Sequence, residues 1–188
     1  MACLLICVIT INNNLSIYIF SAMPLEIERK FLIKGDYKKQ STSHTTIIQG
    51  YICSARGRTV RVRLRDDKCY LTIKGPSTRG GLARYEFEKE ITRDEGLSLL
   101  TICEPGIIHK TRWLVPVGKH VFEVDEFYGD NEGLVMAEVE LQDENEPFER
   151  PDFLGDEVTG KRRYYNSLLR TTPYKKWSKE EKNNTDNP

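Results

Sequence analysis

The chain has 188 residues, of which 30% are charged, and its 28 basic and 28 acidic side chains cancel. This length suits one domain with a sizeable core rather than two domains. The balanced charge argues against a nucleic-acid partner and against a polybasic surface that binds membranes, because both usually show a basic excess. Five cysteines, Cys3, Cys7, Cys53, Cys69 and Cys103, form no CxxC pair, which favours reduced thiols in a cytoplasmic protein.

Residues 1–22 are apolar, but they contain no Lys or Arg, and Asn12, Asn13 and Asn14 interrupt the apolar run. A secretory signal normally has a basic start, and a membrane-spanning helix needs about 20 continuous apolar residues. Met23 stands directly before a charged strand pattern. We therefore expect translation to start at Met23, which makes residues 1–22 a non-native or unstructured extension.

Strand patterns separated by turns rich in Gly, Asp and Asn follow one another along the rest of the chain. The predicted strands are 25–34, 46–54, 59–66, 69–75, 83–91, 108–115, 119–128 and 134–142. Residues 65–68 and 116–119 have the composition of hairpin turns, and 76–82 that of a loop. These patterns predict one α+β domain over 23–174 that is mainly antiparallel β. The polar tail, 175–188, is expected to be disordered.

Two helices are predicted beside the strands. The first covers 92–103, where Thr92 and Glu95 have the spacing of a capping box. The second covers 160–171, where tyrosines and leucines recur at helical spacing and Thr159 is the candidate N-cap.

Charged side chains occupy alternate positions of the predicted strands. Residues two apart in a strand point to the same face of the sheet. The sets that share a face are Glu26, Glu28 and Lys30; Arg61, Arg63 and Arg65; Thr72 and Lys74; Arg84, Glu86, Glu88 and Glu90; Lys110 and Arg112; Glu123 and Asp125; and Glu138 and Glu140.

A solvated face of an antiparallel sheet explains any one of these strands taken alone. Taken together, nearly every outward position is a full charge, and acids and bases lie on different strands. Three arginines on one face repel each other unless an anion or carboxylates lie opposite. About eight antiparallel strands can close into a barrel. We therefore predict an eight-stranded closed β-barrel with the charges inside and the helices packed outside.

The interior of such a barrel has the chemistry of a polyanion site. Carboxylates bind a hard divalent cation through oxygen, and Arg and Lys grip phosphate oxygens. The residues alone therefore predict a metal-dependent site for a polyanion, and a polyphosphate fits it best.

The motifs also recur in a specific order. In chain order they are Glu26-x-Glu28-x-Lys30, Gln49-Gly50-Tyr51, Arg61-x-Arg63, Lys74, Arg84-x-Glu86-x-Glu88, Lys110-Thr111-Arg112, Phe122-Glu123-Val124-Asp125, Ala137-Glu138-Val139-Glu140, Glu157-Val158-Thr159 and Arg163-Tyr164-x-Asn166. This series resembles the CYTH domains, also called triphosphate tunnel metalloenzymes, and their short single-domain bacterial branch. The likeness spans roughly 24–170.

The resemblance implies a tunnel that hydrolyses or rearranges a triphosphate with Mg²⁺ or Mn²⁺. It implies that metal is held by Glu26, Glu28, Asp125, Glu138 and Glu140. It gives Glu86, Glu88 and Glu123 a role at a second metal or in the outer coordination sphere. The implied phosphate-binding residues are Lys30, Arg61, Arg63, Lys74, Lys110 and Arg112.

The resemblance further implies that Lys110, paired with Tyr51, is the base that activates the attacking water. A lysine among other cations has a lowered pKa, which suits a base, whereas the surrounding carboxylates oppose that shift. For Tyr51 the alternative is a packing role beside the tunnel mouth. Arg162, preceded by Lys161, stands where the family often has Lys, and we assign neither a direct role.

Three functions remain open. The leading one is an inorganic triphosphatase that cleaves tripolyphosphate to diphosphate and phosphate. The second is a class IV-like adenylate cyclase or a nucleoside or thiamine triphosphatase, for which Tyr51, Trp113, Phe127 and Tyr128 are candidate base-stacking residues. The third is a non-catalytic polyphosphate-binding module, against which the full set of acids argues. A homodimer is one oligomeric state that the sequence leaves open.

Overall fold

The computed structural model describes residues 5–11, 14–20, 25–55, 57–78 and 83–183. Its strands are β1 (Leu5–Ile11), β2 (Asn14–Phe20), β3 (Leu25–Ile33), β4 (Ser43–Ala55), β5 (Arg58–Arg65), β6 (Lys68–Thr78), β7 (Ala83–Ile91), β8 (Ile108–Val117), β9 (His120–Phe127), β10 (Val135–Leu141) and β11 (Leu154–Glu157). The prediction of a mainly antiparallel β fold is confirmed, and all eight predicted strands are present. β11 is a short addition, and β6 runs into the predicted loop.

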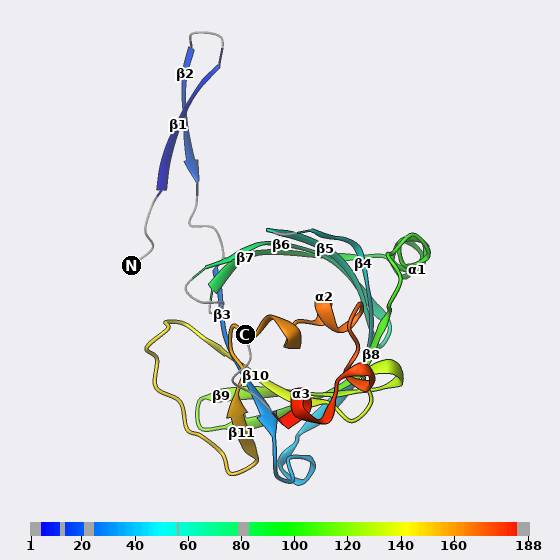
Figure 1. The fold of residues 1–188 in the computed structure, drawn as a ribbon. Coiled ribbons are helices and arrows are strands. Elements are labelled where there is room, and N and C mark those ends of the chain that lie inside the picture. The colour runs from blue at the N-terminus through cyan, green and yellow to red at the C-terminus, as the bar shows by residue number, and fades with distance from the viewer. Residues whose placement is uncertain (1–4, 12–13, 21–24, 56, 79–82, 184–188) are drawn as a thin grey trace.

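The strands β3 to β10 follow the order β10-β9-β8-β4-β5-β6-β7-β3, and β3 also pairs with β10 and β11. Every pairing is antiparallel. Figure 1 shows this sheet curving round a central space, with helix α1 (Arg93–Thr101) on its outside. The pairing of β3 with β7 is short, because it joins only Leu25–Ile27 to Tyr85–Ala83.

The N-terminal strands form a separate unit. β1 and β2 pair with each other as a two-stranded antiparallel sheet, which projects away from the main sheet in Figure 1. Their hairpin differs from an unstructured extension. That translation starts at Met23 stays a prediction.

Helix α1 begins as predicted. Thr92 Oγ1 accepts a hydrogen bond from the backbone N–H of Glu95 at 3.2 Å, and the Glu95 carboxylate accepts one from the backbone N–H of Thr92 at 2.8 Å. This capping box fixes the first turn. The helix then lies against β4, β5 and β6, with the buried Gly96 facing Cys69 of β6.

Replacing Gly96 by alanine is expected to destabilise the fold by about 1–3 kcal/mol, because the new Cβ would stand 2.6 Å from Cys69 Cβ and still closer to its Sγ. A loss of stability would be informative, because helix propensity alone favours alanine over glycine by about 1 kcal/mol and predicts a gain. Urea unfolding measures the effect. Ser98→Ala, on the exposed side of α1, is the control and should change stability little. A Gly96→Ala variant as stable as wild type would show that α1 does not rest on Cys69.

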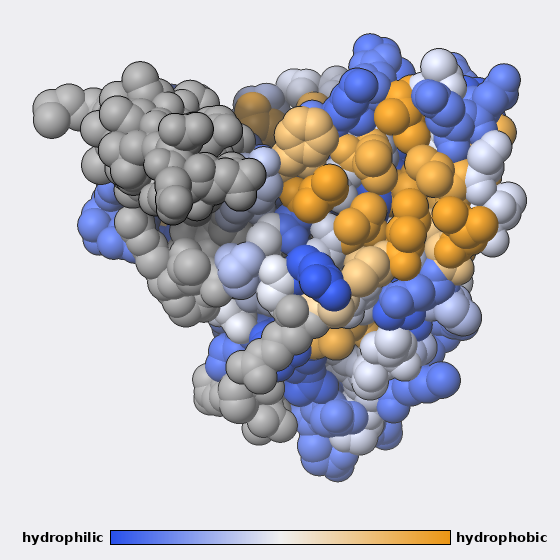
Figure 2. Space-filling model, turned by 90° about the horizontal axis from the view of Figure 1, so that it is seen from above, coloured by the Kyte–Doolittle hydropathy of each residue, from blue (hydrophilic) through white to orange (hydrophobic). Residues whose placement is uncertain are grey.

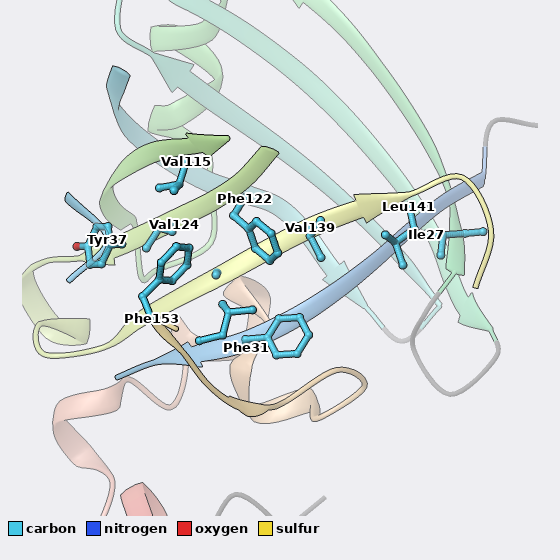
Figure 3. Packing of buried hydrophobic residues seen from close by; sticks show 11 residues of the cluster. Ile27, Phe31, Tyr37, Val115, Phe122, Val124, Val139, Leu141 and Phe153 are labelled. Atoms are coloured by element: carbon cyan, nitrogen blue, oxygen red, sulfur yellow. The ribbon is translucent and has the colours of Figure 1, made fainter. Parts of the chain in front are cut away.

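The larger apolar cluster lies on the outside of β3, β8, β9 and β10 (Figure 3). Phe31, Phe122 and Val139 of these strands pack there with Phe153, which comes from the segment before β11. The sequence predicts that helices cover the outer faces, whereas this face is covered by the irregular segment 142–153. Phe148 and Phe153 supply the aromatic rings, each about 6.0 Å from Phe122, that a helix face would otherwise bring.

The predicted helix over 160–171 is wrong in its extent. The structure has a short 3-10 helix, Arg162–Tyr164, then α2 (Asn166–Leu169), with Tyr165 extended between them. The expected N-cap residue, Thr159, is engaged elsewhere, because its Oγ1 accepts from the backbone N–H of Lys30 at 3.0 Å and donates to Glu157 at 2.6 Å. With its cap residue bound to β3, the segment starts no long helix.

The described part of the tail predicted to be disordered contains two short helical elements. Another 3-10 turn covers Tyr174–Lys176, and α3 covers Lys179–Asn183. Trp177 is 5% exposed and packs with Tyr164 and Leu169 in a second apolar cluster. The polar composition of this segment gave no indication that Trp177 is buried. We call residues 162–177 the C-terminal strap. Within the described residues, no helix has the length and apolar character needed to cross a membrane.

Another apolar surface lies outside β5, β6 and β7. Val60, Ile73 and Phe87 are cross-strand neighbours there, and Ile73 and Phe87 are 39% and 43% exposed. Figure 2 looks onto the side of the molecule that holds β4–β7 at the top of Figure 1, and apolar residues gather on it. The charges of these strands must therefore lie on the opposite, inner face.

Candidate functional site

The inner faces of the strands surround a cavity of about 1280 Å³. Of the residues that the sequence predicts for the site, the cavity is lined by Glu26, Glu28, Lys30, Tyr51, Arg61, Arg63, Lys74, Glu86, Glu88, Lys110, Arg112, Glu123, Glu138 and Glu140. Residues that lie more than a hundred positions apart in the chain thus share one space. Asp125 is the one predicted site residue that does not line it.

One ion-pair network joins β3, β5, β6 and β7. Lys74 binds Glu86 and also Glu26, at 3.1 Å. Arg61 and Arg63 both bind Glu88, the latter at 2.8 Å, and Arg63 is nine-tenths buried. Burial and the neighbouring Arg61 lower the pKa of Arg63 to about 10. The network thus pairs three bases with three carboxylates, and a bound anion would relieve the repulsion between Arg61 and Arg63.

A second network joins β3, β8, β9 and β10. Lys30 binds Glu138 and also Glu28, at 3.0 Å. Arg112 lies at the centre, with Glu138 at 2.9 Å, Asp125 at 2.7 Å and Glu123 as a third partner. The hydrogen bonds to Asp125 are bidentate, a geometry that fixes the guanidinium plane.

Asp125 lies deeper than the other predicted metal ligands, and its role as a ligand stays a prediction. It is 1% exposed, and both of its oxygens accept hydrogen bonds, from Arg112 and from Lys110. Burial alone would raise the pKa of this carboxyl, but Arg112 and Lys110 hold it below its ordinary value. The carboxylate is thus charged, and both of its oxygens are engaged in hydrogen bonds. It lies behind the residues that line the cavity, where it orients Arg112 and Lys110.

Lys110 lines the cavity although it is 1% exposed. Its ammonium binds Asp125 and lies 5.4 Å from the centre of the Phe127 ring. Burial, opposed by Asp125 and reinforced by Arg112, lowers the pKa of Lys110 to about 8. A fraction of this lysine is therefore neutral near pH 7, the state that a general base requires.

Tyr51 also lines the cavity and is 4% exposed. Its hydroxyl oxygen accepts a hydrogen bond at 3.1 Å from the amide of Gln49, which is fully buried. Of the four aromatic residues considered for base stacking, Tyr51 alone lines the cavity in the described part of the chain. Tyr128 instead donates to Thr111 at 3.0 Å.

Several carboxylates lie close enough to Glu140 to influence its ionisation. Glu140 has its pKa raised by burial and by the charges of Glu26, Glu123, Glu28 and Glu86. Several carboxylates thus crowd one region, and a bound cation would relieve their repulsion. Within the described residues, no three acidic, His or Cys side chains are already gathered as a metal cluster, because most of these acids are held by Lys or Arg.

Sequence reasoning assigned no role to three contributors to the site, although it named residues of each. Thr72 binds both Arg61 and Glu88, and Gln49 holds Tyr51. The strap also lines the cavity, through residues that include Arg162 and Asn166. Alternation along the strands predicts the face of the sheet on which Thr72 and Gln49 lie. Because both side chains are neutral, the pattern of charges did not identify them as site residues. The strap residues Arg163, Tyr164 and Asn166 belong to the quoted motifs, but strand alternation does not apply to them and could not place them against the cavity.

Comparison with known proteins agrees with this arrangement. The family model described as the CYTH domain matches residues 24–170. The chain belongs to the CYTH domain family. A CYTH relative, the inorganic triphosphatase of Acetivibrio thermocellus, is 47% identical over 81% of this chain and 97% of its own length. The inorganic triphosphatase of Nitrosomonas europaea is 32% identical over 77% of this chain and 95% of its own.

Solved structures give the same grouping for this CYTH protein. The crystal structure of an inorganic triphosphatase superposes with a TM-score of 0.57 and 29% identity, over 77% of this chain and 97% of the other. A Pyrococcus horikoshii protein, with 21% identity and a TM-score of 0.53 over 64% of this chain and 80% of its own, shows the shared fold alone.

Proposed function

We propose that this CYTH protein hydrolyses inorganic tripolyphosphate to diphosphate and phosphate, in a reaction that depends on Mg²⁺ or Mn²⁺. One observation carries the proposal: charged side chains of seven strands, β3 and β5 to β10, line one cavity, where bases and carboxylates are joined in ion-pair networks. The relatives named above, both inorganic triphosphatases, support the substrate. No aromatic cluster lines the described part of the cavity as a base-binding pocket.

We also propose that the sheet acts as a closed tunnel. Pairing of β3 with β7 on one edge and with β10 on the other supports this. The pairs Glu138–Lys30 and Glu140–Glu28 lie in register across β10 and β3. A continuous wall keeps bulk water from screening the charges, which strengthens their hold on a polyanion.

The carboxylates of Glu26, Glu28, Glu138 and Glu140 would hold the cation. When bound, Mg²⁺ or Mn²⁺ neutralises phosphate charge and polarises the phosphoryl group. Lys30, Lys74, Arg61, Arg63 and Arg112 would grip phosphate oxygens, exchanging their present carboxylate partners for the substrate. Lys110 would take the proton of the water that attacks phosphorus, with Tyr51 beside it.

The experiment that tests the function compares tripolyphosphate, ATP and thiamine triphosphate, each with Mg²⁺ or Mn²⁺. Phosphate, diphosphate and cyclic AMP are followed as products. We expect the highest kcat/KM for tripolyphosphate and no cyclic AMP. A preference for ATP would favour a nucleotide-using enzyme. Retained binding without turnover of any substrate would favour a polyphosphate-binding module.

Changing Glu140 to glutamine is expected to raise the Mn²⁺ concentration for half-maximal activity roughly 10- to 100-fold, a range typical of weakened metal coordination. The amide keeps the shape of the side chain but loses the negative charge that the crowded carboxylates share with the cation. Calorimetric titration of Mn²⁺ without substrate should show the same shift. Glu126→Gln is the control, because Glu126 lies outside the cavity lining and binds Lys38. Equal Mn²⁺ affinity in both variants would remove Glu140 from the metal site.

The cytoplasmic location remains a proposal, supported by the free thiols of Cys53, Cys69 and Cys103. The homodimer stays a prediction.

A further inference from the structure

We propose that Gln49 is a positioning residue that couples the grip of Arg63 on phosphate to the hydroxyl of Tyr51. Its amide nitrogen holds Tyr51. Its amide oxygen accepts a hydrogen bond from Arg63 once that arginine has exchanged Glu88 for a phosphate. This inference rests on the proposed function, because Arg63 and Tyr51 have their roles from it.

Gln49 lies on the inner face of β4, between two groups of the proposed machinery. It is directly opposite Arg63 of β5 in the ladder. Ile47, two positions before Gln49, is opposite Lys110 of β8, and Tyr51 follows two positions after it. Residues two apart in a strand share a face. Gln49 therefore stands between a residue proposed to bind phosphate and the two residues proposed to activate water.

The position of Tyr51 is fixed at both of its ends. The register of β4 against β5 shifts directly after Tyr51, and such bulges re-aim a side chain. The carbonyl of Tyr51 accepts a hydrogen bond at 2.8 Å from the backbone N–H of Glu104. At the other end, Gln49 Nε2 donates to the Tyr51 hydroxyl oxygen at 3.1 Å. Gln49 thus orients the hydroxyl, which the main chain alone does not fix.

The amide oxygen of Gln49 and the Nε of Arg63 are a matching acceptor and donor. Gln49 is fully buried and Arg63 is 9% exposed. Gln49 Oε1 and Arg63 Nε are both buried without a hydrogen-bond partner among the described residues, and each such group costs stability. The Cβ atoms of directly opposite residues in an antiparallel pair lie about 4.5–5.5 Å apart. A small rotation of either side chain can therefore bring this donor and acceptor together.

Another buried amide of the chain shows how a purely structural one is satisfied. Asn131 is 3% exposed, and both ends of its amide are used. Its Nδ2 donates to the carbonyl of Leu169 at 3.3 Å, and its Oδ1 accepts from the backbone N–H of Tyr174 at 2.8 Å. The half-used amide of Gln49 differs from this pattern, which favours a role that is completed when a ligand binds.

Phosphate binding supplies the missing hydrogen bond. In the structure, Arg63 Nη2 donates to Glu88 at 2.8 Å. A phosphate that replaces Glu88 engages the terminal nitrogens of the guanidinium, and Arg63 Nε then turns to Gln49 Oε1. An amide whose oxygen is bound no longer exchanges its oxygen and nitrogen by a half-turn. Its N–H groups stay directed at Tyr51, so the hydroxyl is held in one orientation when substrate is present.

The test is a double-mutant cycle in the full protein, with tripolyphosphate and Mg²⁺. Gln49→Met keeps the length of the side chain but removes its donor and acceptor. We expect kcat to fall roughly 3- to 10-fold, as one net hydrogen bond implies, while KM stays within about twofold. In a Tyr51→Phe background the same change should lower kcat less than about twofold, because the hydroxyl that Gln49 orients is absent. An equal loss in both backgrounds, or an unchanged kcat in Gln49→Met, would overturn the proposal.

Asn131→Leu is the matched control, because it removes a buried amide that touches neither Tyr51 nor Arg63. It should destabilise the fold, and any loss of kcat should be the same with and without the Tyr51 hydroxyl. A loss that depends on Tyr51 as strongly as that of Gln49→Met would mean that the cycle reports a general loosening, and it would also overturn the proposal.

Nuclear magnetic resonance tests the contact with Arg63 without relying on turnover. The side-chain amide signals of Gln49 are identified by their loss in Gln49→Met. Saturating tripolyphosphate should shift them in wild type but not in Arg63→Lys, which keeps the positive charge and lacks Nε. Unshifted signals in wild type, or an equal shift in Arg63→Lys, would contradict the coupling. Lack of any tripolyphosphate turnover by wild type would reject the proposed function, whereas turnover with equal losses in the cycle rejects only this inference.

Discussion

Replacing Lys110 by alanine is expected to lower kcat about 10²- to 10⁴-fold, the usual contribution of a general base, while tripolyphosphate affinity changes little. The reason is its position: its ammonium is buried, and its pKa is lowered to about 8. Single-turnover kinetics together with calorimetric binding of tripolyphosphate separate the two effects. Lost binding with proportionate kcat would mean that Lys110 only clamps the substrate.

Lys110→Arg is the matched control, because arginine keeps the positive charge but does not lose its proton in this range. If Lys110 is the base, this variant is as slow as Lys110→Ala. The sign of the pH effect follows from the reactive form, which is the neutral amine. The wild-type kcat should therefore rise with pH and level off above about pH 8, and the arginine variant should lack this rise. A rise retained in Lys110→Arg would assign the proton to another group.

Changing Asp125 to asparagine is expected to cut kcat/KM about 100-fold, the scale of a small misplacement of reacting groups. The variant leaves Arg112 and Lys110 without their shared carboxylate, and removal of one partner from a buried ion pair costs about 3–5 kcal/mol of stability. Thermal unfolding measures the second effect and steady-state kinetics the first.

The metal requirement distinguishes the structural role of Asp125 from its predicted one. Because both of its oxygens are engaged by Arg112 and Lys110, the Mn²⁺ concentration for half-maximal activity should stay within about twofold of wild type. Glu140→Gln provides the comparison in the same assay. A shift in Asp125→Asn as large as that of Glu140→Gln would restore Asp125 as a metal ligand.

Alternation along each strand was enough to predict which residues share the cavity. Glu26, Glu28 and Lys30 lie on one face for the same reason that Arg61 and Arg63 do, since the strand period is local. The same rule placed Asp125 on the inner face, but it did not predict that Asp125 is buried behind the residues that line the cavity. The burial of this carboxylate depends on its pairing with a longer side chain, here Arg112. That pairing joins two different strands, so the alternation within one strand does not predict it.

The strap was harder to predict for a different reason. Trp177 stands among lysines and acids, and the burial of this one ring depends on Tyr164 and Tyr174, whose ring centres lie 5.2 and 5.1 Å away. The average composition of such a segment is polar, so it does not predict that a single ring is buried. Thr159 likewise has the residue type of a helix N-cap. Its hydroxyl oxygen instead accepts a hydrogen bond from the backbone N–H of Lys30 in β3, which is far away in the chain.

The pairing of β3 has a consequence for how the protein is made. β3 is the first strand of the main sheet to leave the ribosome, yet Lys30 meets Glu138 only after 108 further residues. Contacts of such long sequence separation slow folding, because the chain must pay the entropy of loop closure first. Until β10 is synthesised, β3 exposes an unpaired edge, and unpaired edges invite pairing with other chains. The cavity is therefore completed only late in synthesis, and the nascent chain is most prone to aggregate while β3 has no β10 to pair with.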